Sequence, residues 1–390
     1  MSQTTYDVII VGAGIIGSST AYYLKKQGAS KVLLLDRDEV ASGGTGKSAA
    51  IVRSYYSVPV MARLAKEAVK LFHNLEKEIG TDGGFHATGF TVLVSQDWVE
   101  KAKTVIEMLK KLGIKSDFVP ENDWEKQFPW LITDGIGAVV FEKESGYADP
   151  VQTTEGFVKA FQREGGEFRN RTPVRELIRE GDKVTGVLLE NEKLFTNSVV
   201  NAAGPWSKFL AKSIELELPM EAVREQDSIW EVRPRKGLPT TPVANQIEAT
   251  YMRPMGEGRW LFGRAYPKPY FECDPYNFKE SADEDFLEDL YKRWCKRIPG
   301  LEGSKMLNAY AALYDVTPDW IPFVGPRSGI EGYYDASGGS GHAFKTGPIF
   351  GRELAEWIVQ GTVRDDFRQF SYDRISDKNL FIQAFGGNRV

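Results

Sequence analysis

One glycine-rich segment near the end of the chain carries residues that could do chemistry. Segment 335–348, DASGGSGHAFKTGP, contains four glycines, one of the three histidines (His342) and, three residues later, Lys345. Because glycine costs backbone entropy, such a run indicates that something must approach the backbone closely. The segment therefore indicates a close ligand contact, to which Lys345 adds a positive charge.

The residues after this run predict a helix over 346–361. Pro348 fits its first turn and Gly361 fits its end. The apolar stripe between them consists of Phe350, Leu354, Trp357 and Ile358. Because a helix N-terminus stabilises negative charge, we expect backbone N–H groups from Gly341 to Gly347 to face the ligand.

A second glycine pattern, Gly12-x-Gly14-x-x-Gly17, follows the apolar segment 6–11, which predicts a buried strand. Gly12 allows a tight turn, Gly14 lets a pyrophosphate approach the backbone, and Gly17 lets the next helix pack closely. A second apolar strand, KVLLLD, ends in Asp36, 24 residues after Gly12 (36 − 12), which is the right distance to bind a ribose. An acid here disfavours a 2′-phosphate, but the pattern alone does not separate NAD from FAD.

The elements around these motifs change in character along the chain. Segment 37–57 is rich in glycine and serine, as a loop that follows a ligand would be, and a long amphipathic helix comes next. Its apolar stripe consists of Leu64, Ala68, Leu71, Leu75 and Ile79. TGFTVLVS then predicts a strand, DWVEKAKTVIEMLKKLG a solvated helix, and later segments predict hairpins, one turning at 180–182, and an apolar strand, SVVNAAG.

These elements predict an α/β fold with two parts. The first is a Rossmann-type nucleotide-binding domain, and the second is a substrate domain with an antiparallel or mixed sheet that interrupts the first domain twice. We expect the first domain to comprise residues 1–80, 140–215 and 305–390, and the second to comprise residues 81–139 and 216–304.

Composition excludes several classes of protein. The 390 residues carry 49 basic and 54 acidic side chains, a net charge of −5, so nucleic acid is not expected as a partner. The two cysteines, Cys273 and Cys295, lack disulfide-framework or zinc spacing, so no metal is expected and a reducing, cytoplasmic setting fits. No stretch is apolar for long enough to predict a membrane span.

Four motifs together resemble the flavin-dependent amine oxidoreductases of the D-amino acid oxidase superfamily. They are DVIIVGAGIIGSSTAYYL at 7–24, GYADP at 146–150, VVNAAGPWS at 199–207 and SGHAFKTGP at 340–348. The branch that they resemble most contains sarcosine oxidase, glycine oxidase and the proline dehydrogenase β-subunit. The resemblance implies FAD rather than NAD, and a second-domain sheet that covers the reactive face of the flavin.

The resemblance also implies residues that handle the substrate. Sarcosine oxidases bind the substrate carboxylate with an arginine and a lysine, which correspond here to Arg53 and Lys345. Burying such cations without an anionic partner is unfavourable, which gives a physical reason to expect a carboxylate between them. Tyr314 matches a pocket tyrosine, His342 matches a histidine beside the flavin, and Tyr251 is a candidate for the opposite wall. The competing interpretations are surface ion pairs for the two cations, a sheet-face aromatic for Tyr251 and an indirect role for His342.

The cofactor-binding residues follow from the motifs and from the resemblance. They are Gly12, Gly14, Ile15, Ile16, Gly17, Asp36, Arg37, Ser42, Gly43, Gly44, Lys47, Ser48, Ala49, Ala50, Val174, Ala202, Ala203, Gly204, Trp206, Gly339, Ser340, Gly341, His342, Ala343, Phe344 and Lys345.

The sequence departs from the family at three positions. Monomeric sarcosine oxidases attach FAD through a cysteine where this chain has Ala312, and the dimethylglycine branch uses a histidine where it has Lys47. We therefore predict non-covalent FAD. A lysine that speeds the reaction with oxygen corresponds to Leu261, with Arg259 or Arg264 as candidate substitutes, so the electron acceptor can be oxygen or another carrier.

The function that the resemblance implies is oxidation of a small amino acid at its amine, which is primary, secondary or N-methylated. The substrate has a carboxylate, loses a hydride equivalent and becomes an imine that water hydrolyses. One alternative is a 2-hydroxy acid dehydrogenase of the same superfamily, for which His342 is the candidate base. Another is an FAD-binding subunit or assembly protein with little activity of its own, which the retained Arg53 and Lys345 disfavour.

Overall fold

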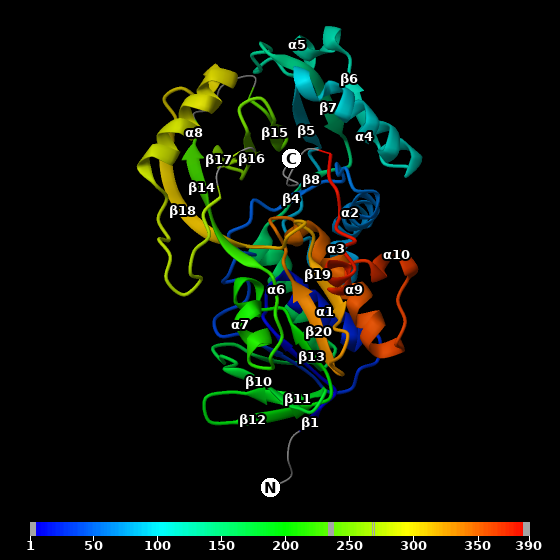
Figure 1. Ribbon diagram of the computed structural model, residues 1–390. Helices are drawn as coiled ribbons and strands as arrows, with labels where there is room; N and C mark the ends of the chain where they lie inside the picture. Colours follow the sequence, from blue (N-terminus) through cyan, green and yellow to red (C-terminus); the bar gives the residue numbers. More distant parts are fainter. Residues whose placement is uncertain (1–4, 233–237, 267, 269, 385–390) are drawn as a thin grey trace.

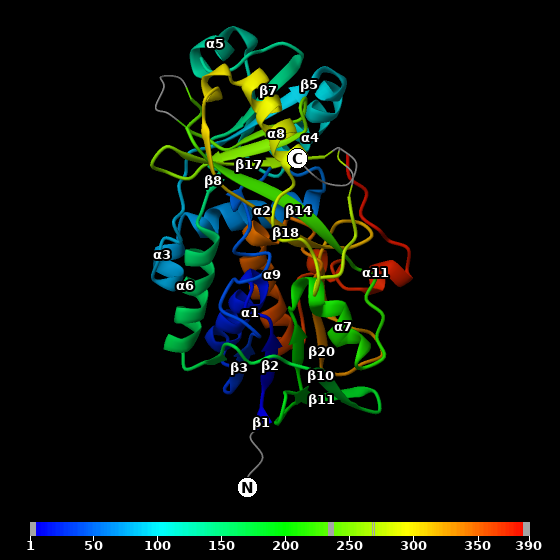
Figure 2. The same cartoon turned by 90° about the vertical axis from the view of Figure 1, so that its left-hand side faces the viewer.

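The computed structural model describes residues 5–232, 238–266, 268 and 270–384. In Figure 1 a lower body holds β13, α1 and α9, and an upper body is built on a large sheet with α8 on one side and α4 on the other. Figure 2 shows the same two bodies after a quarter turn. This arrangement confirms the predicted fold class.

A six-stranded sheet forms the centre of the lower body. The described strands follow the order β19 (Phe323–Pro326), β20 (Tyr333–Ser337), β13 (Val199–Asn201), β2 (Val8–Val11), β3 (Val32–Leu35) and β9 (Glu167–Arg169). β2 and β3 are wholly aliphatic and wholly buried, as expected where helices cover both faces of a sheet. All pairs are parallel except β19 with β20, so the predicted Rossmann-type sheet is confirmed.

Three helices carry the functional loops on this sheet: α1 (Ile15–Lys26), α6 (Pro150–Arg163) and α9 (Ala343–Gln360). α9 begins at Ala343 and not at 346, so the predicted helix start is wrong and Pro348 lies inside the helix. The reason is tertiary packing. A Cβ atom on Gly347 would lie 2.9 Å from the Ile15 side chain, and one on Gly351 would lie 2.3 Å from the Ser19 hydroxyl. These glycines let α9 pack closely on α1.

The predicted long helix after the first loop is divided in two, α2 (Pro59–Phe72) and α3 (Leu75–Ile79). The prediction of one continuous helix is wrong at His73 and Asn74. Their side chains bind backbone carbonyls: Asn74 Nδ2 donates to the Lys70 carbonyl over 2.7 Å, and His73 Nε2 lies 2.8 Å from the Glu144 carbonyl. The contact of Asn74 with Lys70 is local, and local contacts of this kind compete with helix continuation.

Two smaller sheets complete the lower body. The first has the order β1 (Thr5–Tyr6), β12 (Lys193–Thr196), β11 (Lys183–Leu188) and β10 (Glu176–Glu180). The predicted hairpin at 180–182 is confirmed, because β10 and β11 are antiparallel and Gly181 has a φ of 62°. The second sheet pairs β4 (Ile51–Val52) with β8 (Gly146–Tyr147).

The upper body is an eight-stranded mixed sheet. Its order is β18 (Lys305–Val316), β14 (Glu221–Glu231), β17 (Arg259–Arg264), β16 (Thr250–Pro254), β15 (Val243–Asn245), β5 (Phe90–Ser95), β7 (Ile136–Glu142) and β6 (Ser116–Val119). Only β15 and β5 run parallel among these described strands. The predicted strand TGFTVLVS is β5, and α4 packs against β5 and β6.

The remaining elements lie around the two bodies. They are the helices α4 (Val99–Lys111), α5 (Trp124–Gln127), α7 (Ser207–Lys212), α8 (Glu284–Arg297), α10 (Asp365–Arg368) and α11 (Asp373–Ser376), and the 3₁₀ turns η1 (Gln96–Trp98), η2 (Glu121–Asp123), η3 (Gly204–Trp206) and η4 (Pro299–Leu301). α8 covers the outer face of the large sheet, where Trp230, Phe262 and Trp294 belong to one buried cluster. The inner face of the sheet packs against α4 at the β5–β6 end and faces the lower body elsewhere.

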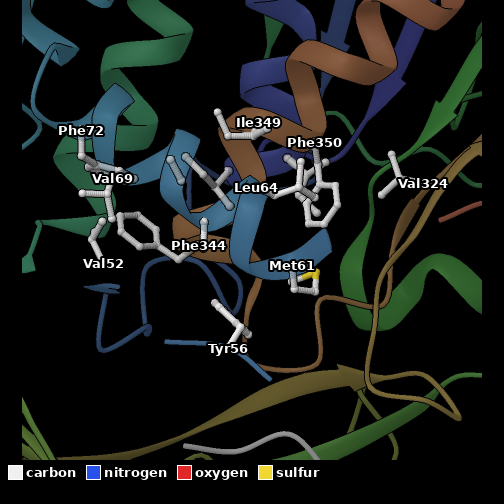
Figure 3. Close-up of a cluster of buried hydrophobic side chains, with 14 of the residues drawn as sticks. Val52, Tyr56, Met61, Leu64, Val69, Phe72, Val324, Phe344, Ile349 and Phe350 are labelled. Atoms are coloured by element: carbon white, nitrogen blue, oxygen red, sulfur yellow. The ribbon is translucent and has the colours of Figure 1, made fainter. Parts of the chain in front are cut away.

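An apolar core joins α2, α9 and the loop after β4 beneath that inner face (Figure 3). Phe72 of α2 and Phe344 of α9 have ring centroids 5.6 Å apart, and Leu64 and Ile349 are fully buried. Tyr56 lies at the edge of the group in Figure 3. This core fixes the start of α9 against α2.

The large sheet takes in residues 305–316 as β18 and extends through residue 142 in β7. The division into domains given above assigns both segments to the nucleotide domain, and that division stays a prediction.

We also searched the described residues for membrane-spanning helices and for groups of side chains that could bind a metal ion. In the described ranges, no helix is both long and apolar enough to cross a membrane. The same ranges hold no group of three or more His, Cys, Asp or Glu side chains placed to bind a metal ion. Cys273 and Cys295 are not joined in a disulfide.

Candidate active site

Two cavities share part of their walls between the lower body and the inner face of the large sheet. The larger has a volume of about 880 Å³ and the smaller about 100 Å³. The larger is within the range of about 300–1,000 Å³ that is typical of ligand pockets. Residues that line both cavities are Ser48, Ala49, Tyr314, Gly341 and Phe344.

The larger cavity gathers most of the residues predicted to bind the cofactor. Those on its wall are Gly12, Gly14, Ile15, Ile16, Asp36, Arg37, Ser42, Gly43, Gly44, Lys47, Ser48, Ala49, Val174, Ala202, Ala203, Gly204, Trp206, Gly339, Gly341, Ala343 and Phe344. Ala50, Ser340, His342 and Lys345 line the smaller cavity instead. Gly17 lines neither cavity, because it packs against the backbone.

The three glycines of the first motif make three different contacts. A Cβ atom on Gly12, whose φ is 110°, would lie 2.3 Å from the Ala202 carbonyl oxygen, and one on Gly17 would lie 1.9 Å from the Gly12 carbonyl oxygen. Both glycines therefore allow close backbone packing. Gly14 is nearest to Thr45, whose hydroxyl accepts a 3.2 Å hydrogen bond from the Ile15 amide at the start of α1.

Asp36 stands directly after β3 and joins the two loops that follow the first strands. Its carboxylate accepts hydrogen bonds from the amides of Ala13, over 2.6 Å, and Asp38, over 2.9 Å. Burial raises the pKa of Asp36, and the two amides oppose that shift. The carboxylate thus fixes the loops while it faces the larger cavity.

Arg37 and Trp206 contact each other on the wall of this cavity. The guanidinium carbon lies 3.8 Å from the centre of the indole ring. The indole N–H of Trp206 is buried and has no hydrogen-bond partner within the described part of the chain. An unpartnered buried donor, a glycine-walled floor and an acid at the end of a strand together fit a bound dinucleotide.

The end of β18 holds the glycine-rich run in place. The Asp315 carboxylate accepts a 2.8 Å hydrogen bond from the Gly338 amide, and its backbone carbonyl accepts one of 3.0 Å from the Ser340 amide. Gly341 has a φ of 79°, and a Cβ atom there would lie 2.6 Å from the Tyr314 ring. Gly347 packs on α1, so the expected contact of this backbone with a ligand does not extend to Gly347.

The smaller cavity brings together all five side chains predicted to handle the substrate. They are Arg53, Tyr251, Tyr314, His342 and Lys345. The first comes from the loop after β4, two come from strands of the large sheet, and two come from the start of α9. All five are thus close in space, and their individual roles stay predictions.

Two buried cations form one end of this cavity, with Tyr56 between them. Lys345 Nζ donates a 3.1 Å hydrogen bond to the Tyr56 hydroxyl, which also lies 3.3 Å from Nδ1 of His342. The Arg53 guanidinium carbon stands 4.6 Å from the centre of the Tyr56 ring. Burial lowers the pKa of Lys345 well below its ordinary value, and the charge of Arg53 adds to the effect. Burial also raises the pKa of Tyr56 to about 12.

Glu142 supplies negative charge behind the loop that carries Arg53. Its carboxylate accepts hydrogen bonds from the Ser54 amide, over 2.9 Å, and from the Ser145 hydroxyl, over 2.8 Å. Burial raises the pKa of Glu142, while these hydrogen bonds and the charge of Arg53 oppose the shift. Glu142 therefore holds the backbone beside Arg53.

The opposite wall carries a hydrogen bond that crosses a strand. Gly263 of β17 pairs with Asp227 of β14 on one side and with Tyr251 of β16 on the other. The Tyr251 hydroxyl donates a 2.6 Å hydrogen bond to the Asp227 carboxylate. A Cβ atom on Gly263 would lie 2.2 Å from that carboxylate and 2.4 Å from the hydroxyl. Only glycine lets the two side chains meet there.

The residues that depart from the family pattern lie on the cavity walls, on the surface or in the core. Ala312 and Lys47 line the larger cavity, and Arg264 lines the smaller. Arg259 is exposed and pairs with Glu257 on the surface. Leu261 is buried and lines neither cavity.

Sequence reasoning missed several polar residues at the site: Thr45, Tyr56, Glu142, Asp227, Glu225 and Lys268. Glu225 and Lys268 form an ion pair on the cavity walls. One signal was available for the acids, because Glu225 and Asp227 are two residues apart in a strand and so face the same side. No sequence signal pointed to Tyr56 apart from its position three residues after Arg53.

The sequence model of the family described as DAO, FAD dependent oxidoreductase, matches residues 7–357. FAD-dependent oxidoreductase domain-containing protein 1 of Bos taurus is 28% identical over 398 residues, which cover 91% of this chain and 81% of that protein. 4-Methylaminobutanoate oxidase (formaldehyde-forming) of Paenarthrobacter nicotinovorans is 25% identical over 374 residues, 94% of this chain. That match covers 45% of the oxidase, so the chain spans less than half of its length.

Among solved structures, L-proline dehydrogenase from P. horikoshii is similar with a TM-score of 0.89 and 24% identity. The superposition covers 97% of this chain and 100% of the dehydrogenase chain. At this identity the likeness concerns the fold alone.

Proposed function

Because the chain belongs to the DAO family of FAD-dependent oxidoreductases, with FAD as its cofactor, we propose that it oxidises a small amino acid at its amine. The proposed substrate carries a carboxylate and a primary, secondary or N-methylated amine. It loses a hydride equivalent from the carbon next to nitrogen and leaves as an imine, which water hydrolyses. FAD, when bound, supplies the acceptor for the two electrons.

The observation that carries this proposal is the pair of cations at the end of the smaller cavity. Arg53 and Lys345 are 5% and 6% exposed, and burial together with the charge of Arg53 lowers the pKa of Lys345. Two positively charged groups this close together in a buried site favour the binding of an anion. A substrate carboxylate supplies that anion and is held by charge-assisted hydrogen bonds. Fixing this group orients the neighbouring C–H bond toward the larger cavity, which lowers the entropic part of the barrier.

The larger cavity supports FAD as the group beside this site. Gly12 and Gly14 would admit the pyrophosphate, Asp36 would bind the ribose, and the Trp206 indole N–H would donate to the cofactor. The N-terminus of α9, at Ala343 and Phe344, would stabilise negative charge at the ring system. None of these contacts requires a covalent bond, and Ala312 and Lys47 cannot form those of the covalently flavinylated relatives.

The related 4-methylaminobutanoate oxidase carries in its name a substrate with both an N-methylated amine and a carboxylate. This supports an amino acid with a secondary amine as the first class of compound to test. The electron acceptor, oxygen or another carrier, and a cytoplasmic location stay predictions.

The test is a titration of the FAD-loaded protein without oxygen. Amino acids, N-methyl amino acids and the matching 2-hydroxy acids are added separately, and the flavin absorbance is followed. We expect bleaching by amines and not by hydroxy acids. Bleaching by hydroxy acids alone would replace the proposal with a hydroxy acid dehydrogenase, and no bleaching by either class would favour an FAD-binding subunit. Admitting air afterwards separates an oxidase from a dehydrogenase.

A further inference from the structure

The smaller cavity and its boundary contain a buried amine group and a buried carboxyl group, and each is hydrogen-bonded to a tyrosine. Lys345 donates to Tyr56 at one end, and Asp227 accepts from Tyr251 at the other. Asp227 is 8% exposed and belongs to no ion pair in the described part of the chain. Buried charges are normally paired with a charge of the opposite sign. The arrangement therefore lacks a cation at Asp227 as well as an anion at Lys345.

Asp227 lies at the boundary between the two cavities. It lines the larger cavity, whereas its partner Tyr251 lines the smaller, and Tyr314 lines both. The hydrogen bond between Asp227 and Tyr251 thus crosses the boundary between the two cavities. A substrate in the smaller cavity with its carboxylate at Arg53 would extend toward this boundary, where its reacting atoms must meet the occupant of the larger cavity.

We propose that Asp227, oriented by Tyr251 across Gly263, binds the cationic amine of the substrate, so that the site selects a zwitterionic amino acid over a 2-hydroxy acid. The inference rests on the proposed function, because it takes Arg53 and Lys345 as the partners of the carboxylate. An ammonium group brings the charge that Asp227 lacks, whereas a hydroxyl group brings none. The amine N–H groups would donate to the carboxylate, and no covalent step is involved.

The surroundings of Asp227 agree with this role. Tyr251 and Arg253 approach it from β16, Tyr310 from β18, Glu225 from its own strand, and Lys268 from the segment after β17. Lys268 is already bound to Glu225, and Arg253 donates to the Pro254 carbonyl over 3.0 Å. Burial raises the pKa of Asp227 to about 7, against the Tyr251 hydrogen bond. The carboxylate is therefore charged above neutral pH and protonated below it.

Two inert ligands that differ in one group provide the test. 2-Aminoisobutyrate and 2-hydroxyisobutyrate have no hydrogen on the α-carbon, so they measure binding without oxidation. Their affinities for the FAD-loaded protein are measured by calorimetry or by the perturbation of flavin absorbance. We expect the wild-type protein to bind the amine about tenfold more tightly or better at pH 8, because a hydrogen bond between charged groups is lost with the hydroxyl.

Asp227→Asn keeps the shape of the side chain and removes its charge. This variant should lose the preference for the amine while it keeps its affinity for the hydroxy acid. In the wild type, the preference should also decline as pH falls through 7, and in Asp227→Asn it should not change with pH. Asp117→Asn, on the exposed side of β6 in the same sheet, serves as the matched control and should behave as the wild type.

A preference that persists in Asp227→Asn, or that is absent from the wild type, would overturn the inference. If Asp227→Asn does not fold, Tyr251→Phe provides a second test, because it keeps the carboxylate of Asp227. We expect Tyr251→Phe to lower the affinity for 2-aminoisobutyrate by a smaller factor than Asp227→Asn and to leave the affinity for 2-hydroxyisobutyrate unchanged. This inference can fail while the proposed function holds. Amines would then bleach the flavin of the wild-type protein, but the protein would not prefer 2-aminoisobutyrate over 2-hydroxyisobutyrate.

Discussion

Lys345 and Tyr56, 289 residues apart in the chain, are joined by a 3.1 Å hydrogen bond from the ammonium nitrogen to the phenolic oxygen. The same oxygen lies 3.3 Å from His342 Nδ1, and Arg53 stacks near the ring. Tyr56 thus contacts the cations from both halves of the proposed carboxylate clamp. Its neutral hydroxyl orients Lys345 without neutralising it.

Replacing Tyr56 by phenylalanine should weaken carboxylate binding. Lys345 loses the acceptor that orients it, so we expect KM for the substrate to rise about tenfold, as for the loss of one hydrogen bond to a charged group. The effect on kcat should be smaller, because the ring and its contact with Arg53 remain. Steady-state kinetics measures both values. Tyr22→Phe is the control, since it removes a buried hydroxyl that donates to the Glu78 carbonyl in the lower body. Equal KM values for Tyr56→Phe and wild type would contradict the orienting role.

Binding of a carboxylate should be accompanied by proton uptake at Lys345. Burial and Arg53 hold the pKa of Lys345 low in the free protein, and a bound anion raises it. Between the free and bound pKa values, binding therefore protonates Lys345, and carboxylate affinity falls as pH rises, by at most about tenfold per pH unit. Calorimetry with acetate in buffers of different ionisation enthalpy counts the protons. Lys345→Met should bind acetate without uptake, and a wild-type protein that takes up none between pH 6 and 10 would exclude this mechanism.

Removing the guanidinium of Arg53 should affect substrate binding more than cofactor binding. We expect Arg53→Ala to raise KM by about 10- to 100-fold, since hydrogen bonds to charged groups contribute about 1.5–3 kcal/mol. Arg53 lines only the smaller cavity, so FAD content should stay near that of the wild type. Arg259→Ala, which removes an exposed arginine of β17, is the matched control. An unchanged apparent affinity in Arg53→Ala would show that the carboxylate is bound elsewhere.

A comparison of Gly341 with Gly361 separates the effect of backbone strain from the effect of contact with Tyr314. Gly341 has a φ of 79° and faces the Tyr314 ring, whereas Gly361 has a φ of 70° and would have no atom within 4 Å of an added Cβ. Alanine at either position costs the left-handed backbone about 1 kcal/mol. Only Gly341→Ala also brings a methyl group against the Tyr314 ring, which lines both cavities and must shift. We expect it to lower FAD affinity and substrate affinity, measured by flavin fluorescence and titration, while Gly361→Ala lowers only the melting temperature. Similar FAD binding by the two variants would remove the special role of Gly341.

Acid precipitation should release the flavin from the protein. Ala312 and Lys47 line the larger cavity. By the resemblance they correspond to the flavin-attaching residues of other branches, and alanine has no group that could form such a bond. We expect the yellow colour in the supernatant after precipitation with trichloroacetic acid, and an intact protein mass without an added FAD. Colour that stays in the pellet would show a covalent attachment that these positions do not explain.

The parts of this protein that sequence predicts well are those fixed by local geometry. Gly12, Gly14 and Asp36 stand at fixed distances along one strand–helix–strand unit, so their spacing alone identifies a nucleotide site. Arg53 and Lys345 could be paired only through the resemblance, because nothing local relates residues so far apart. The start of α9 was misplaced because proline is favoured in the first turn of a helix and glycine is disfavoured in its interior, and close packing on α1 overrides both preferences here.

The acid on the opposite wall could not be identified for a different reason. Asp227 owes its burial to the register of three strands, and its contact with Tyr251 exists because the strand between them carries Gly263. Strand order and register in a mixed sheet depend on non-local pairing, which a single sequence does not reveal. Glu142 likewise depends on a contact between β7 and the loop after β4.

The order of strands in the lower body also sets the order in which the protein can be completed on the ribosome. β2 lies between β3 and β13, with Ile9 opposite Val199, and β13 in turn pairs with β20. The aliphatic edge of β2 therefore leaves the exit tunnel long before its partner on one side has been synthesised. Nascent chains that stop before β13 should bind chaperones or aggregate, because an unpaired apolar strand edge is a template for association.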